Sequence, residues 1–318
     1  MRKFSALLAF LSLAITSPAL ADEQLDADRE TLALLQLADA RLHTIGWSLA
    51  TGNAPFCDVA QPSVGLLLQD MAAFKNADRM RAAANVVTDI AVQAVAAESP
   101  AAKLGLSANM SIFVLDGVDV RTLPAPEVGY ERLAQLNGLS DAALQRDGYV
   151  NITWRESPFG AVTGESIFGV PACTGRFEML TNSKRASADG QRVLIGMEFP
   201  GLAYADDEFA AAVAHEFAHN LLGHRAMLDA KPRQISTRAS EREADRMMPW
   251  LLANAGYDPA AALRFMQRWG PKHGGGIFRA RSHDGWDERA ENIAAELPLI
   301  AASIERNGSA DWSKDFVR

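Results

Sequence analysis

The segment at residues 215–219, with the sequence HEFAH, combines residue types that can bind and use a zinc ion. Residues four apart on an α-helix differ by about 40° in direction, so the imidazoles of His215 and His219 can close on one ion. Glu216 stands beside the first histidine, where a carboxylate can act as general base on a zinc-activated water. The segment therefore predicts a hydrolytic site with one Zn²⁺ ion per chain, provided that neighbouring elements supply its other parts.

The first missing part is a third protein ligand, and the next predicted helix offers three acidic residues for it. Glu241 and Asp245 are four residues apart and share a helix face, whereas Glu243 points about 160–200° away from both. We therefore predict that Glu241 is the third ligand and that Asp245 orients a ligating histidine through its second ring nitrogen. Glu243 is predicted to be a solvated or salt-bridged surface residue. The alternative is that all three acids form a charged helix face.

His224 is close to the motif in sequence but is predicted to lie away from the metal. It lies about 140° around the helix from His219, on the apolar stripe of that helix. The metzincin spacing HExxHxxGxxH also fails here, because Gly223 and His224 each miss the required position by one. We therefore expect His224 to pack or to cap. The stripe consists of Phe209, Val213, Phe217 and Leu221.

The elements that must position the motif are predicted from hydrophobic spacing and turn residues. Two short strands, 176–181 and 192–199, are joined by a polar turn that contains Asp189-Gly190. The helix with the motif begins at acidic residues, which suit its dipole. Helices are expected at residues 206–224, 238–254, 258–269 and 287–306, with a glycine loop at 274–276.

The N-terminal residues have the pattern of a secretory signal peptide. Two basic residues precede an apolar run at 4–15, and an A-x-A cleavage site follows at 19–21. We predict a signal peptide at residues 1–21, cleaved after Ala21, and an exported, periplasmic protein that is soluble after cleavage. The alternative is a short membrane anchor, but the run is too short to span a bilayer comfortably. No other segment has that apolar length, so no stable membrane insertion is expected.

The length, composition and charge of the chain limit its domain count and its class of partner. Its 318 residues are enough for two modest domains, and 48% of them are hydrophobic, as in ordinary globular proteins. The formal net charge is −8, and the sequence holds no basic cluster. This charge argues against nucleic acid as a partner.

The sequence contains two cysteines, Cys57 and Cys173. In an oxidising compartment such a pair is expected to form one disulfide bond. The alternative is two unrelated buried thiols. Neither cysteine belongs to a cluster of metal ligands, so we predict a structural disulfide.

Helices are expected at residues 26–50 and 66–84, with a loop at 51–63, and a β-rich segment follows them. A strand at residues 90–97 precedes the phrase S-P-A-A-K-L-G-L and a second strand that ends in Asp116-Gly117, a tight-turn signal. Later strands are expected at 149–156 and 165–170.

This order of strands and turns, over residues 89–168, resembles the PDZ domains of bacterial secreted proteases. One departure is Asn109-Met110, which stands where those domains usually carry Gly-Asp. The resemblance implies a module that docks protein or peptide substrates by adding a strand to a sheet edge and capturing a terminal carboxylate. The sequence does not locate the carboxylate-binding loop, and the alternative is a structural insert without a ligand.

The motif HExxH, followed by E-x-x-A-D at residues 241–245 and A-G-Y-D-P at residues 255–259, resembles the HtpX-like gluzincin metallopeptidases (peptidase family M-48). The likeness covers about residues 175–318. It implies a mainly helical domain with a short β-sheet, in which an edge strand near Asp189-Gly190 holds the substrate backbone.

The segment 281–289 resembles the later S/T-H-P…R segment of the same family, with Asp284 in place of the proline. The resemblance implies that His283 reaches the open position of the metal or contacts the transition state, and that Arg289 orders the site. The alternative is that His283 is a histidine of a surface loop.

Together these features predict an α+β protein: a mainly helical gluzincin metalloprotease domain with a short β-sheet, and a PDZ-like β-rich domain. The expected function is a secreted, periplasmic zinc-dependent endopeptidase that hydrolyses peptide bonds of unfolded or envelope proteins. The alternatives are a chaperone-like binding protein with a plugged or regulatory metal site, and a small-molecule amidase. The predicted parts are a signal peptide (1–21), an N-terminal helical segment (22–88), a PDZ-like domain (89–168) and a zinc metalloprotease domain (169–318).

Overall fold

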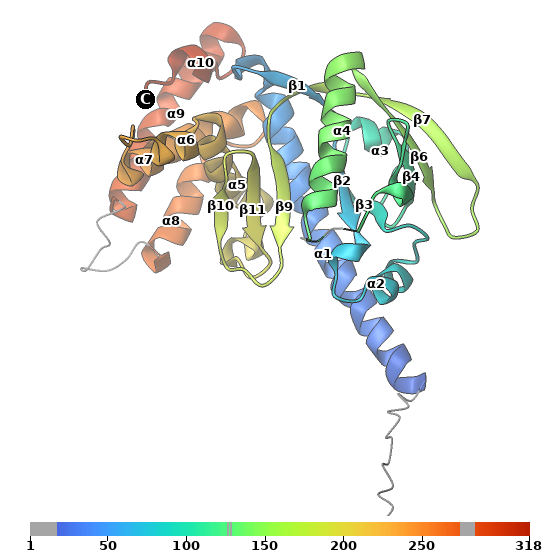
Figure 1. Ribbon diagram of the computed structural model, residues 1–318. Coiled ribbons are helices and arrows are strands. Elements are labelled where there is room, and N and C mark those ends of the chain that lie inside the picture. The colour runs from blue at the N-terminus through green and yellow to red at the C-terminus, as the bar shows by residue number, and fades with distance from the viewer. Residues whose placement is uncertain (1–17, 126, 128, 274–283) are drawn as a thin grey trace, which may run out of the picture.

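The structure is a computed structural model of the whole chain, and it describes residues 18–125, 127, 129–273 and 284–318. The fold is mixed α+β, as predicted (Figure 1). The long helix α1 (Pro18–Gly52) runs between two parts of the molecule. We call them the β-rich part (residues 64–169) and the helical part (residues 174–318), and each has a hydrophobic core of its own.

Helix α1 confirms the helix predicted at residues 26–50 and extends it in both directions. Its buried face, with Leu42 and Leu49 fully enclosed, belongs to the core of the helical part. Gly46 lets that face approach the sheet closely, since a Cβ atom there would lie 2.1 Å from the ring of Phe177. Residues 1–17 of the predicted signal peptide (1–21), which include its whole apolar run, lie outside the described residues. Among the residues described, no helix is both long and apolar enough to cross a bilayer.

The β-rich part is built on a six-stranded antiparallel sheet in the order β2-β3-β4-β6-β7, with β5 paired to β4. The strands predicted at 90–97, 149–156 and 165–170 are confirmed, and so is the strand before Asp116-Gly117. Helix α4 (Glu131–Asp147), which the sequence analysis did not predict, packs on the sheet through Leu133, Leu136 and Leu144. The strands are β2 (Leu66–Asp70), β3 (Ile90–Val95), β4 (Ser111–Leu115), β5 (Val118–Asp119), β6 (Tyr149–Arg155) and β7 (Val162–Phe168).

The helix predicted at residues 66–84 is wrong in its first half. Strand β2 (Leu66–Asp70) and the turn η2 (Met71–Ala73) occupy it, and only α2 (Ala77–Ala84) is helical. A short run of leucines is compatible with a helix or a buried strand. Here it forms a strand because it pairs with β3. The six-stranded sheet therefore begins before residue 89.

The loop predicted at residues 51–63 also contains a strand. Strand β1 (Ala60–Ser63) pairs with β8 (Val170–Cys173) in a two-stranded ribbon that connects the two parts. The predicted disulfide between Cys57 and Cys173 is confirmed, with a Cα–Cα distance of 5.8 Å. It ties the end of α1 to the ribbon. Short helical turns complete this half of the chain at η1 (Ala54–Phe56), α3 (Pro100–Lys103) and η3 (Val120–Thr122).

The helical part contains a three-stranded sheet in the order β10-β11-β9. The two predicted strands, β9 (Arg176–Leu180) and β11 (Arg192–Gly196), are confirmed, but they pair in parallel. The connection between them is therefore more than the polar turn that was predicted, and it contains a third strand, β10 (Ala186–Ala188). Strand β10 pairs antiparallel with β11 and is the outer strand on the side that packs against α5.

All four helices predicted for this part are present, and their bounds differ at the ends. The first of them stops early, at Leu221, because Gly223 takes a left-handed conformation (φ 67°) and a new short helix begins at His224. The predicted glycine loop at 274–276 lies outside the described residues. The bounds are η4 (Pro200–Ala203), α5 (Asp206–Leu221), α6 (His224–Asp229), α7 (Thr237–Asn254), α8 (Ala261–His273), α9 (Trp286–Asn307) and α10 (Trp312–Asp315).

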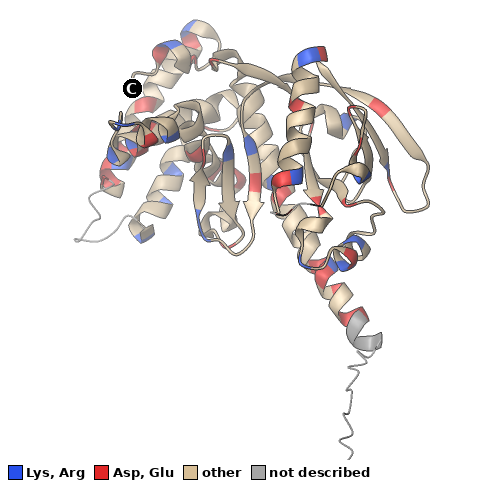
Figure 2. Ribbon diagram, viewed as in Figure 1, with Lys and Arg blue, Asp and Glu red and all other residues tan. Residues whose placement is uncertain are grey.

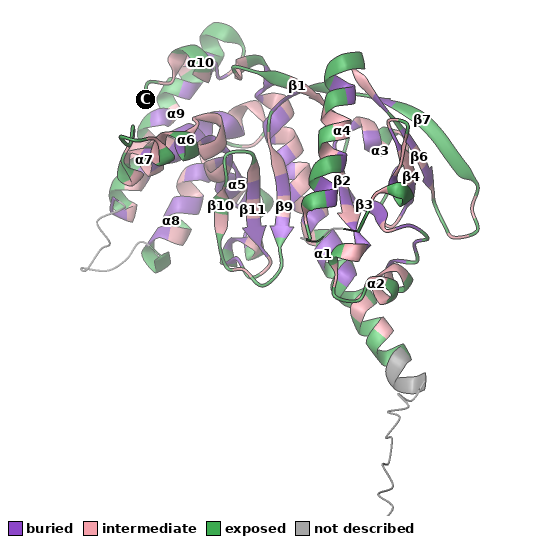
Figure 3. Ribbon diagram, in the orientation of Figure 1, coloured by how far each residue is buried: buried purple, intermediate pink, exposed green. Residues whose placement is uncertain are grey.

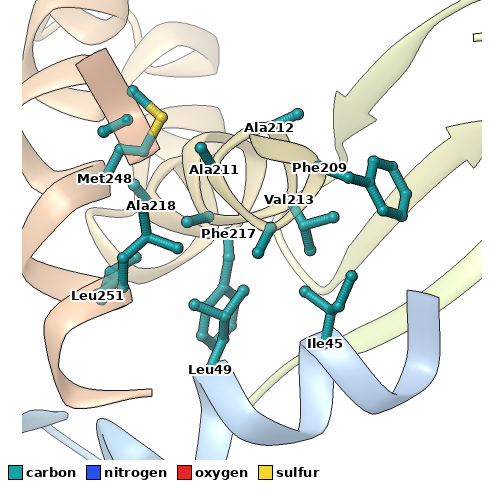
Figure 4. Packing of buried hydrophobic residues seen from close by; sticks show 14 of the residues in the cluster. Ile45, Leu49, Phe209, Ala211, Ala212, Val213, Phe217, Ala218, Met248 and Leu251 are labelled. Atoms are coloured by element: carbon teal, nitrogen blue, oxygen red, sulfur yellow. The ribbon is translucent and has the colours of Figure 1, made fainter. Parts of the chain in front are cut away.

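Helix α5 lies at the centre of the helical part (Figure 4). Its apolar stripe packs against Ile45 and Leu49 of α1, and Phe209, Val213 and Phe217 of the stripe are fully buried. Figure 3 shows the contrast with β7, which is exposed along most of its length. Anchored on one side by this core, α5 holds its histidines toward α7 on another.

Candidate metal centre

Helices α5 and α7 bring the three predicted ligands together. The Nε2 atoms of His215 and His219 are 3.3 Å apart. The Glu241 carboxylate lies 3.5 Å from each of them, through Oε2 to His215 and through Oε1 to His219. The group could hold a metal ion, because one ligand atom of each residue lies within 4.8 Å of the others.

Small side chains allow the two helices to approach so closely. Ala211, Ala214 and Ala218 of α5 and Ala244 of α7 are fully buried in the shared core. Helix α7 begins at Ser236, whose hydroxyl accepts a hydrogen bond from the backbone N–H of Ala239. This cap fixes the start of α7, and the ligand on α7 lies within two turns of it.

The His215 ring is held from behind by a buried carboxylate. Asp245 Oδ1 lies 3.0 Å from His215 Nδ1, and the Asp245 side chain is 1% exposed. Arg289 of α9 donates two hydrogen bonds to the same carboxylate, of 2.5 and 2.7 Å. Burial alone would raise the pKa of Asp245, but the hydrogen bonds from His215 and Arg289 outweigh it and hold that pKa below its ordinary value.

The His219 ring is held by a second imidazole that sequence reasoning assigned to packing. His224 is buried as expected, but its Nδ1 also lies 2.9 Å from His219 Nδ1. The angle of 140° between them assumes that α5 continues, and the helix instead ends before Gly223. Glu243 is salt-bridged, as predicted, to Arg318 at 2.7 Å, and its Oε2 lies 3.1 Å from His224 Nε2.

The electrostatics of the three predicted ligands favour a cation. Burial tends to lower the pKa of His215, but hydrogen bonds to Asp245 and Glu241 raise it to about 10, so this ring sits where positive charge is stabilised. Burial, together with the neighbouring His215, lowers the pKa of His219 to about 3. Burial opposes ionisation of Glu241, yet the nearby histidines lower its pKa to about 2.

Glu216 differs from the other carboxylates of the site. Burial raises its pKa to about 7, the carboxylates of Glu241 and Asp245 add to this rise, and His215 and Arg289 oppose it. A carboxyl group with a pKa near neutrality can both accept and return a proton.

Ion pairs join α7 to α9 around the site. Arg289 pairs with Asp245, and Arg246 donates to Glu296 at 2.6 Å. Asp284, which lies just before α9, accepts a hydrogen bond of 2.8 Å from Arg242. Figure 2 shows acidic and basic positions interspersed along both helices. The predicted site residue His283 lies outside the described residues, whereas Arg289 approaches Glu241 Oε2 to 4.0 Å in addition to its pairing with Asp245.

A separate cavity of about 410 Å³ lies where the two parts meet. One wall is the segment 63–67, which leads into the outer strand β2 of the six-stranded sheet, and another is α4, through Asn137, Ser140 and Leu144. His43 and Trp47 of α1, the two-stranded ribbon of β1 and β8, the start of β9 and the turn at Gly190 also line the cavity.

No family model, curated protein or solved structure matches this chain.

Proposed function

We propose that this protein is a zinc-dependent endopeptidase, and the observation that carries the proposal is the spacing of two imidazole nitrogens and one carboxylate group. Zinc binds imidazole nitrogens and carboxylate oxygens at about 2.0–2.2 Å in tetrahedral geometry, which sets two ligands of one ion about 3.3–3.5 Å apart. The two imidazole Nε2 atoms of His215 and His219 are 3.3 Å apart, and each lies 3.5 Å from one oxygen of the Glu241 carboxylate, His215 from Oε2 and His219 from Oε1. Two nitrogens and one oxygen leave the fourth position open, as in hydrolytic zinc sites.

Each residue has a role that its surroundings support. Bound zinc would supply a Lewis acid and lower the pKa of a water molecule. Glu216 accepts the proton of the attacking water and returns it to the leaving amine, a role for which a pKa of about 7 is suited. Asp245 fixes His215 in the tautomer with a bare Nε2, and Arg289 keeps that carboxylate ionised and in place.

The sheet beside α5 favours a peptide over a small amide as substrate. Strand β10 is the outer strand of its sheet and packs against the helix that carries both histidines. An extended chain can add to such an edge through its backbone groups, which presents a peptide bond in a fixed direction. The disulfide and the N-terminal pattern support a periplasmic site of action, with unfolded or envelope proteins as substrates.

The test compares the parent protein with Glu216→Gln on a denatured protein substrate, with zinc content measured in both. We expect one zinc per chain in each protein, internal cleavage by the parent and a loss of about 10²–10⁴-fold in rate for the variant. Glu305→Gln, a change of an exposed glutamate on α9, is the matched control and should cleave as the parent does.

The outcomes separate the alternatives. Undiminished cleavage by Glu216→Gln removes Glu216 from the mechanism, and a parent without zinc removes the metal from it. A parent that binds zinc but yields no internal fragments points to the amidase.

The second candidate function is peptide docking without turnover, and the cavity between the two parts favours it. Edge strand β2 forms one wall of that cavity and α4 lies across from it, an arrangement suited to an added peptide strand. This supports a PDZ-like role for the β-rich part.

Docking is measured with a fluorescent peptide that has a free carboxylate end, in the Glu216→Gln protein. Ser140→Trp, which fills the cavity, should weaken binding at least tenfold, whereas Ala134→Trp on the exposed face of α4 should not. Equal binding to both variants would exclude the cavity as the docking site.

A further inference from the structure

His219, the second predicted ligand on α5, is in contact with another histidine on the side of its ring away from Nε2. His219 Nδ1 faces His224 Nδ1 at 2.9 Å, and the two rings meet edge to face with centroids 4.9 Å apart. His224 Nε2 in turn faces Glu243 Oε2 at 3.1 Å, and Arg318 donates to the same oxygen at 2.8 Å. A continuous line of polar contacts thus runs from Arg318 to a predicted metal ligand.

The protons along this line are fixed by what each group can donate. A carboxylate only accepts, so the Nε2 of His224 must carry the hydrogen that faces Glu243. A neutral His224 then has a bare Nδ1, which can only accept, and His219 must place its own hydrogen on Nδ1. The Nε2 of His219 is therefore bare, and this is the nitrogen that faces His215 and Glu241. A metal ligand requires that tautomer.

We infer that His224 and Glu243 are positioning residues that fix the tautomer and the ring orientation of His219, an inference that rests on the proposed function. Arg318 holds Glu243 in place through its ion pair and also donates to the backbone oxygen of Leu222, so it fastens the turn that leads into His224. The turn itself depends on Gly223, whose left-handed conformation folds His224 back onto His219. In this line His224 and Glu243 contact His219 Nδ1 and each other, on the side of the His219 ring away from Nε2.

Glu243→Gln is the sharpest variant, because it keeps the shape of the side chain and removes the charge. A glutamine can present either its oxygen or its NH₂ group to His224, so the direction of the hydrogen-bonded line is no longer fixed. His224→Leu removes the acceptor altogether, and His224→Gln restores one. Glu291→Gln, an exposed change on α9, is the matched control.

Zinc affinity is measured by competition with a chelator, and the ligand field by the absorption of the cobalt-substituted protein. We expect zinc binding to weaken about 10–100-fold in His224→Leu and by a smaller factor in Glu243→Gln, with partial recovery in His224→Gln. The cobalt spectrum should change in the first two variants and stay unchanged in the control. Affinity within twofold of the parent and an unaltered cobalt spectrum in both variants would overturn the inference.

A second measurement keeps this test separate from that of the proposed function. Nitrogen-15 NMR of the imidazoles in zinc-free parent protein reports which nitrogen of His219 carries the hydrogen. We expect Nδ1–H in the parent and a mixture of tautomers in Glu243→Gln. A parent with Nε2–H on His219 refutes the positioning role whether or not zinc binds. A parent with Nδ1–H on His219 but no affinity for zinc instead refutes the proposed function, and the positioning role of His224 and Glu243 stands.

Discussion

Asp245 and Asp39 are both almost completely buried, and their surroundings shift their pKa values in opposite directions. Asp245, in the metal centre, faces Arg289 and His215, and its pKa lies below the ordinary value. Asp39 of α1 is 4% exposed and accepts hydrogen bonds from the Gln93 side chain at 2.8 Å and the Met179 backbone at 2.9 Å. Within the described residues no arginine or lysine pairs with Asp39, and burial raises its pKa to about 6.

The comparison shows that burial alone does not decide the charge of a carboxylate. Two N–H donors reduce the effect of burial on Asp39, but the nearby Glu178 adds to it. At Asp245 the hydrogen bond from His215 and the two from the Arg289 guanidinium together reverse that effect. In the candidate metal centre this charged carboxylate lies 3.0 Å from His215 Nδ1, where we propose that it orients a ligand. Asp39 instead links three elements, α1, β3 and β9, at the boundary between the two parts.

The largest expected effect comes from removing the charge of Asp245. Asp245→Asn removes the carboxylate that accepts both hydrogen bonds of Arg289, which is 17% exposed, and leaves only the more distant Glu241 at 4.0 Å. Loss of one partner of a buried pair costs about 3–5 kcal/mol of unfolding free energy. Zinc affinity should fall about 10–100-fold as well, because the amide no longer fixes the tautomer of His215. Urea unfolding and chelator competition measure the two effects.

The control for this prediction is an exposed pair of the same type. Asp229→Asn removes the partner of Arg225 where both side chains are about 60% exposed, and pairs of that kind contribute little. If Asp245→Asn were as stable as Asp229→Asn, the contrast between a paired and an unpaired buried aspartate would lose its basis.

The sequence predicted the grouping of His215, His219 and Glu241 correctly, because regular helices set the positions of these residues. Glu241 and Asp245 are one turn apart on α7, and a helical face can be calculated from spacing alone. It failed for His224, because that histidine follows a break in the helix. Nothing in the angle between residues 219 and 224 reveals that Gly223 ends the helix, although glycine at such a position is itself a signal of a helix end.

The β-rich part shows a second limit, which is the non-local origin of strand pairing. The leucines of β2 were read as helical because their partner strand lies more than twenty residues away in the sequence. Asp39 was missed for a similar reason. It occurs in a predicted amphipathic helix as one more acidic residue, and only the approach of β3 and β9 buries it.

At Asp39 we expect a smaller change in unfolding free energy, and the asparagine variant should gain stability where Asp245→Asn loses it. The folded-state pKa of about 6 lies above the unfolded value, so the folded protein keeps a proton that the unfolded chain loses. Stability from this group is therefore complete at low pH and is lost as the pH rises from about 4 to about 6. Asp39→Asn cannot lose that proton, and it should be more stable than the parent above pH 6 by at most about 3 kcal/mol, the equivalent of a pKa shift of about two units.

An asparagine fits this site because Gln93 Oε1 has no hydrogen-bond partner among the described residues. A turn of the Gln93 amide would offer that oxygen to the new Asn NH₂ group, while the remaining oxygen still accepts from Met179. The measurement is the difference in unfolding free energy between variant and parent at several pH values. The difference also cancels the contribution of His43, whose lowered pKa of about 4 gives a slope of opposite sign in both proteins. A difference that stays constant from pH 4 to pH 7.5 would mean that Asp39 is ionised throughout, as Asp245 is, and that an arginine is not what separates the two sites.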